Sequence, residues 1–137
     1  MRVFFDSSGL AKRYIKERGS DKVEEILSGA SEVAVSMIAP PEIVSALCRL
    51  HRQNALSAAQ YGQAKKGLFA DIEDMTICNV TVPVIGRAIE LLERHPLRTM
   101  DALHLACAID WQADLFVSSD RHQVTAAQKS GLRVMQV

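Results

Sequence analysis

Short apolar runs separated by helical stretches are the feature that most constrains the fold of this chain. Strands that alternate with helices form parallel sheets covered on both faces. The chain therefore predicts an α/β fold, a three-layer α/β/α sandwich around a central, mostly parallel sheet of about five strands. The runs with the length and flanking residues of strands are Arg2–Phe5, Glu32–Ile38, Thr76–Thr81, Leu115–Ser118 and Leu132–Gln136.

Helical spacing of apolar residues fills the stretches between these runs. A first helix is expected to carry Leu10 and Tyr14 and to stop at Gly19. The helix expected over Ser57–Asp74 contains Gly62 and Gly67, each of which lowers helix stability by up to about 1 kcal/mol relative to alanine. This helix is therefore expected either as one piece or as two. The further helices are expected at Ser20–Gly29, Pro40–Arg52, Ser57–Asp74, Val84–Glu93, Thr99–Gln112 and His122–Lys129.

Composition limits the function classes. The 137 residues suit one domain, and 16 Lys and Arg balance 16 Asp and Glu. Because the net charge is zero, any nucleic-acid contact must come from a local patch. No apolar stretch has the length of a membrane span, and the start is too short for a signal peptide, so we expect a cytoplasmic protein without a membrane partner. The three cysteines are expected to be reduced core residues.

Four carboxylates lie where ligand sites form in such a sheet, beside the carboxyl ends of the strands. Asp6 ends the first strand and Glu42 opens the helix after the second. Asp101 begins an almost entirely apolar helix, and Asp120 follows the fourth strand. Each acid alone is also explained as a helix cap, a preference of about 0.3–2 kcal/mol. Asp6 and Asp101 fit that explanation less well, because both adjoin segments that must be buried.

Gathered by the fold, these acids predict a site for a hard divalent cation. Carboxylates that converge without an equal number of basic groups repel one another unless a cation lies between them. Oxygen ligands suit Mg²⁺ or Mn²⁺, whereas zinc prefers histidine or cysteine. Such an ion can ionise a water and neutralise charge on a phosphoryl group, so the pattern indicates hydrolysis of a phosphodiester or a phosphomonoester.

The neighbouring polar residues are less specific. His104, one helical turn after Asp101, is interpreted as a packed or hydrogen-bonding residue rather than a metal ligand. Ser7 and Ser118 are candidates to hold a water or a phosphate oxygen, although serine beside aspartate is also ordinary capping chemistry. No nucleophile elbow, P-loop or dinucleotide-binding fingerprint occurs.

Four segments, in this order, resemble the PIN-domain family, and specifically the VapC-type toxins of type II toxin–antitoxin pairs. They are Val3–Tyr14, Pro41–Arg49, Leu97–Ala106 and Ala113–Arg121. The resemblance covers nearly the whole chain and implies a single PIN domain over residues 1–137. One departure is Pro40–Pro41 ahead of the glutamate, where less rigid residues are common in the family.

The resemblance implies an endoribonuclease. Asp6, Glu42, Asp101 and Asp120 would form its acidic catalytic and metal site, with Ser118 at the Ser/Thr position two residues before the last acid. The cofactor would be Mg²⁺ or Mn²⁺, and RNA cleavage would leave a 5′-phosphate and a 3′-hydroxyl. The family also implies a prokaryotic cytoplasmic protein, a homodimer, and a small VapB-type antitoxin whose C-terminal segment occupies the cleft.

Basic residues near the acids are candidates for RNA or phosphate contacts. Arg49 shares a helix face with Glu42. Arg98 and Arg121 lie close in sequence to two of the acids, and Lys12 belongs to a basic cluster expected on the first helix. The alternative for each is an ordinary solvated side chain.

Two other functions remain open from the sequence. The first is a catalytically silent PIN-like module that binds RNA or protein, which the lack of excess basic charge favours. The second is a small phosphatase that uses the same carboxylates on a phosphomonoester.

Overall fold

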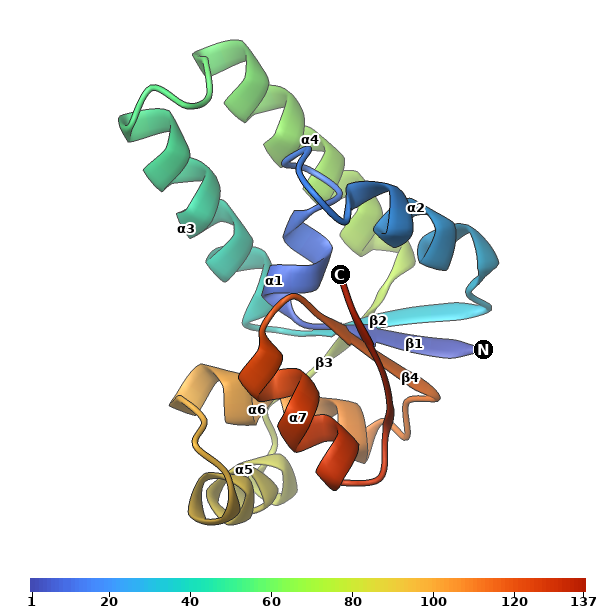
Figure 1. The fold of residues 1–137 in the computed structure, drawn as a ribbon. Helices are drawn as coiled ribbons and strands as arrows, with labels where there is room; N and C mark the ends of the chain where they lie inside the picture. Colours follow the sequence, from blue (N-terminus) through green and yellow to red (C-terminus); the bar gives the residue numbers. More distant parts are fainter.

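The computed structural model describes all residues from 1 to 137 and has three layers, with helices on both faces of one sheet (Figure 1). The strand order is β3-β2-β1-β4-β5, and every neighbouring pair is parallel. The predicted α/β/α class is confirmed, with a sheet that is wholly parallel. The strands are β1 (Arg2–Phe5), β2 (Glu32–Ser36), β3 (Thr76–Cys78), β4 (Leu115–Ser118) and β5 (Arg133–Gln136).

The helices divide between the two faces of the sheet. Helices α1 to α4 cover one face and α5 to α7 cover the other, while α3 and α4 form a hairpin that projects from the body (Figure 1). None is long and apolar enough to cross a membrane. Their bounds are α1 (Ser7–Ala11), α2 (Ser20–Gly29), α3 (Ala39–Arg52), α4 (Ala58–Asp74), α5 (Val82–Arg94), α6 (Thr99–Asp110) and α7 (Arg121–Lys129).

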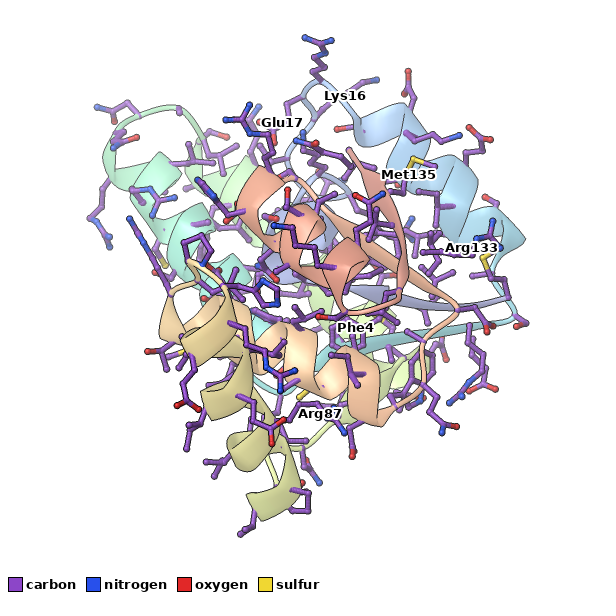
Figure 2. All side chains as sticks on the ribbon, turned by 60° about the horizontal axis from the view of Figure 1, so that its bottom comes forward. Phe4, Lys16, Glu17, Arg87, Arg133 and Met135 are labelled. Atoms are coloured by element: carbon purple, nitrogen blue, oxygen red, sulfur yellow. The ribbon has the colours of Figure 1, made fainter.

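Successive side chains of β1 pack alternately into two hydrophobic cores, one on each face of the sheet. Val3 and Phe5 pack on the side of α1 to α4, whereas Phe4 packs on the opposite side with Phe116 and residues of α5 to α7. Figure 2 shows Phe4 in the interior, while Lys16 extends outward at the periphery. Because successive side chains of a strand point to opposite faces, a short apolar strand buried on both faces fixes its place in the middle of the sheet.

The expected first helix is wrong in length. Helix α1 ends at Ala11, and the chain continues in turns to Gly19, which has a positive φ of 97°. Tertiary bonds replace the missing helical turns. The Tyr14 hydroxyl donates to Asp71 of α4 at 2.7 Å, and the Lys12 carbonyl accepts from the Ser20 hydroxyl at 2.7 Å. The periodicity of the apolar residues therefore reflects packing of a turn rather than a continued helix.

Other boundaries also differ from expectation. Helix α4 is one piece, since a capping box between Ser57 and Gln60 starts it and buried Leu68 anchors it despite its two glycines. Strands β2 and β3 are shorter than the apolar runs suggested. Ile38 already has helical backbone angles at the start of α3, and Thr81 caps α5.

The two central strands create the crevice at which ligands bind in open sheets of this kind. Strand β1 lies between β2 and β4. After β1 the chain turns to α1 on one face, and after β4 it turns to α7 on the other. Because the two connections diverge, the carboxyl ends of β1 and β4 border an open edge, the usual position of a ligand site.

Candidate active site

A pocket of about 120 Å³ lies at this edge, and none of its lining residues is hydrophobic. The four acids identified in the sequence all line it, although they come from the ends of two strands and the first turns of two helices. Its lining residues are Asp6, Ser7, Ser8, Glu42, Asp101, His104, Asp120 and Gln123. The fold thus brings together side chains that are up to 117 residues apart.

Asp6 is the buried centre of the site, with only 1% of its surface exposed. Its Oδ1 accepts hydrogen bonds from the Ser8 hydroxyl and the Gly9 amide, both at 2.8 Å. Its Oδ2 accepts from the Ser118 hydroxyl at 2.6 Å and from Gln123 Nε2 at 2.8 Å. Burial nevertheless raises the pKa of Asp6, since it removes the charge from water. The donors around it compensate only in part.

Glu42 is fixed by two neighbours at the start of α3. Its Oε1 accepts a hydrogen bond from the Ser7 hydroxyl at 2.6 Å and lies 2.5 Å from His104 Nε2. The hydrogen bond with His104 lowers the pKa of Glu42 against the opposing effect of burial. His104 is buried in α6, and its Nδ1 has no partner. The interpretation of His104 as a hydrogen-bonding residue is confirmed.

Asp101 projects from the first turn of α6. Its Oδ2 accepts a hydrogen bond from the Arg98 backbone amide at 3.3 Å, and its Oδ1 accepts from Gln123 Nε2 at 3.1 Å. Burial raises the pKa of Asp101, and the like charges of Asp120 and Glu42 act in the same direction. One amide group therefore connects Asp101 with the most buried acid of the site, Asp6.

Asp120 and Ser118 continue the pocket from the end of β4. Asp120 is the N-cap of α7, and its Oδ1 accepts from the His122 amide at 2.8 Å. Ser118 is fully buried and accepts from the Asp120 amide at 2.9 Å while it donates to Asp6. Asp120 therefore both caps α7 and lines the acidic pocket.

The lining residues suit a hard cation in kind and in place. Carboxylate and hydroxyl oxygens dominate, which are the donors that Mg²⁺ and Mn²⁺ prefer. Asp6 Oδ2 and Asp101 Oδ1 both accept a hydrogen bond from the same nitrogen atom, Gln123 Nε2, so the two carboxylates face the same part of the pocket. In the arrangement described, no three His, Cys, Asp or Glu side chains are close enough together to enclose a metal. Gln123 bridges Asp6 and Asp101 instead, and His104 contacts Glu42.

The basic residues predicted to contact RNA differ in whether their side chains are free. Arg49, Arg98 and Arg121 are exposed and form no ion pair within 4.0 Å. Lys12 does not line the pocket. Its side chain is 12% exposed, and its Nζ donates to the Arg18 carbonyl at 2.5 Å. Lys12 is therefore occupied within the protein, while the three arginines are free.

Gln123 was missed by sequence reasoning. Its side chain donates a hydrogen bond to Asp6, as does the Ser8 hydroxyl. One signal for Gln123 was available. It stands three residues before Ala126 and four before Ala127, so it shares the buried face of α7. A polar residue on a buried helix face requires a partner, and the predicted acids were candidates for that partner.

Fold and site together define a three-layer α/β/α protein with a carboxylate-lined pocket at the switch point of a parallel sheet. Residues 3–129 match the PIN domain family. Ribonuclease VapC45 of Mycobacterium tuberculosis (strain CDC 1551 / Oshkosh) is 31% identical over 96% of this chain and 93% of that protein. The chain belongs to the PIN-domain family and, within it, to the VapC group.

Solved structures share the fold. Mycobacterium tuberculosis VapC20, a sarcin–ricin loop cleaving toxin, aligns with a TM-score of 0.70 at 17% identity, over 98% of this chain and 99% of that one. A toxin–antitoxin complex from Klebsiella pneumoniae aligns with a TM-score of 0.65 at 16% identity, over 86% of both chains. At such identities the likeness concerns the fold. It agrees with the expected PIN-like architecture.

Proposed function

We propose that this chain is an endoribonuclease toxin of a type II toxin–antitoxin pair that hydrolyses RNA phosphodiester bonds with the help of Mg²⁺ or Mn²⁺. The observation that carries the proposal is the convergence of Asp6, Glu42, Asp101 and Asp120 on one polar pocket. Membership of the VapC group supports the substrate class, because its relatives are named ribonucleases.

Asp6, Asp101 and Glu42 would hold the ion, and Asp120 lines the same pocket. When bound there, a divalent ion supplies charge neutralisation at the scissile phosphate and lowers the pKa of a water. Asp6 is already aligned by four different donor residues, which reduces the reorganisation needed on binding.

The reaction needs a proton acceptor for the attacking water. We assign this role to Asp120. One of its carboxylate oxygens accepts a hydrogen bond from the His122 amide, and the other has no protein partner. The water oxygen would form a bond to phosphorus as the bond to the 3′-oxygen breaks, and the 3′-oxygen would take a proton from solvent, which leaves a 5′-phosphate and a 3′-hydroxyl. The free guanidinium groups of Arg98 and Arg121, at the starts of α6 and α7, would bind neighbouring RNA phosphates.

Two protein partners are part of the proposal. A small VapB-type antitoxin would cover the acidic pocket, which the likeness to toxin–antitoxin complexes supports. A second copy of the chain would cover the outer side of α5, where Val82, Ile85 and Ile89 form an exposed apolar stripe at helical spacing. The toxin and its antitoxin would act in the cytoplasm of a prokaryotic cell.

The test is RNA cleavage by the purified chain with MnCl₂ and with EDTA. Native protein should cleave only with the ion, and Asp6→Asn and Asp101→Asn should each lose at least about 100-fold in rate while keeping the native circular dichroism. Equal cleavage by the native and Asn chains, both chelator-washed and free of contaminating nuclease, would refute the proposal. Mn²⁺-stabilised protein without cleavage would instead favour a silent binding module, and turnover of a phosphomonoester alone would favour a phosphatase.

A further inference from the structure

Gln123 is the one uncharged amide in the acidic pocket. It is the third residue of α7, and only 2% of its surface is exposed. Its position is fixed by the packing of Ala126 and Ala127, which are buried on the same face of the helix. The amide group is therefore held inside the pocket and cannot turn out to solvent without disturbing α7.

The nitrogen and the oxygen of this amide differ in their hydrogen bonds. Nε2 lies 2.8 Å from Asp6 Oδ2 and 3.1 Å from Asp101 Oδ1. An amide nitrogen carries two hydrogens, so each carboxylate receives one. Oε1 is buried and has no partner. A buried amide oxygen without a donor is costly, so this arrangement persists because the nitrogen end gains more by separating two acids than the oxygen end loses.

We propose that the Gln123 amide is the protein's own substitute for the divalent ion, and that ion binding displaces its nitrogen from between Asp6 and Asp101. The proposal rests on the proposed function, because that function supplies the ion. The two oxygens that Nε2 contacts are the oxygens that an ion shared by both acids would take. Ions of this kind bind oxygen at about 2.1 Å, so the N–H groups cannot remain between the same two atoms.

Displacement of the nitrogen needs no movement of α7. The last side-chain torsion of Gln123 is broad, so Nε2 can leave the two carboxylates while the rest of the side chain stays in place.

This role has an unusual thermodynamic consequence. Removal of the amide should destabilise the ion-free protein, in which the two carboxylates would then repel each other, and should leave the ion-bound protein nearly unaffected. By linkage, a change that destabilises only the ion-free state tightens ion binding by the same factor. An ordinary supporting residue behaves in the opposite way, since its loss weakens binding.

The experiment compares thermal unfolding in EDTA and in MnCl₂, together with calorimetric titration of MnCl₂, for the native chain and Gln123→Met at pH 8. In EDTA the variant should melt about 3–6 °C below the native protein. In saturating MnCl₂ the two midpoints should converge, and the variant should bind Mn²⁺ roughly five- to tenfold more tightly. Ser20→Ala, which removes a buried hydroxyl of α2, is the control and should lower both midpoints equally.

The outcomes separate this inference from the proposed function. If Mn²⁺ neither binds nor stabilises the native chain, the ion site itself is refuted and this inference fails with it. If Mn²⁺ stabilises the native chain but Gln123→Met loses as much with the ion as without it, or binds it more weakly, Gln123 is a supporting residue and only this inference fails. Should Gln123→Met not fold, Gln123→Ala provides the same test, since it also removes the amide without adding an ion ligand and should show the same gain in Mn²⁺ affinity.

Discussion

The hydroxyl of Ser118 donates a hydrogen bond to Asp6 Oδ2 at 2.6 Å, across the junction of β1 and β4. The parallel register pairs Phe5 with Val117, so the next residue of each strand stands side by side at the carboxyl edge. Two acids of the site thereby share one anchor, because Ser118 also accepts from the Asp120 amide.

Ser118→Ala should reduce RNA cleavage by about 10- to 100-fold near neutral pH, because Asp6 loses its shortest donor. That bond stabilises the ionised carboxylate, so its removal raises the pKa of Asp6 further and shifts the acidic limb of the rate profile to higher pH. The measurement is the pH profile of kcat/KM. Ser130→Ala, which removes a hydroxyl on the far end of α7, should leave the profile unchanged; a parallel loss in both variants would argue against a role at the site.

The acids were predictable because each adjoins a strand end or a helix start, positions that the sequence marks with apolar runs and capping residues. Their convergence followed from the parallel sheet, in which the carboxyl ends of strands meet at one edge. The contribution of Gln123 could not be predicted in this way. Its partners are 117 and 22 residues distant, and an amide has no characteristic spacing.

The end of α1 shows the same limit. Local periodicity continues through Tyr14, but the helix stops at Ala11, because Arg13 and Tyr14 bind Asp71 of the distant α4. Only tertiary packing decides between a helix and a turn with the same apolar residues. That boundary also decides which basic residues are free, since it removes Arg13 from any surface patch.

His104→Leu should lower cleavage by about 10- to 100-fold and leave the fold intact, because Glu42 loses the partner that stabilises its charged form. His104→Gln is the matched variant, since its amide nitrogen can occupy the place of Nε2 and should restore part of the rate. Cleavage assays at a fixed MnCl₂ concentration make the comparison. Equal rates for the leucine and glutamine variants would show that His104 acts only as a packed side chain.

Gly9→Ala should destabilise the protein by about 1–3 kcal/mol, because a Cβ at residue 9 would lie 2.8 Å from the Val117 carbonyl oxygen. Backbone, rather than a flexible side chain, causes the clash, so relief requires β4 to move relative to α1. Gly62→Ala is the opposite case. It lies within α4 with nothing near its added Cβ and should stabilise by about 0.5–1 kcal/mol. Urea unfolding measures both, and equal signs for the two would contradict the packing described.

Ile89→Glu should convert the proposed dimer into a monomer, because it places a charge in the apolar stripe of α5, on which Val82 is 82% exposed. Light scattering after size-exclusion chromatography measures the mass. Arg87→Glu, a charge reversal on the same helix, tests whether charge alone causes the change. If the native chain is monomeric at all concentrations, or if Ile89→Glu stays dimeric, α5 is not the self-association surface.

Asp71→Asn should destabilise the protein near neutral pH by roughly 1–2 kcal/mol, because Asp71 ties the turn after α1 to α4. Its Oδ2 accepts from Arg13 Nε at 2.6 Å and from the Tyr14 hydroxyl at 2.7 Å. Although burial opposes ionisation, these bonds leave the pKa of Asp71 below its usual value of 3.8.

The pH dependence follows from the direction of this shift. A carboxyl whose folded-state pKa is depressed contributes stability that is fully present above its unfolded pKa and is lost as the pH falls through the folded value. The stability difference between native protein and Asp71→Asn should therefore be constant from pH 6 to pH 8 and shrink below about pH 3.8. Urea unfolding across this range measures the difference, with Glu73→Gln, an exposed neighbour without an ion pair, as the control. A difference that persists unchanged at pH 2 would mean that Asp71 stabilises by packing and neutral hydrogen bonds, not by its charge.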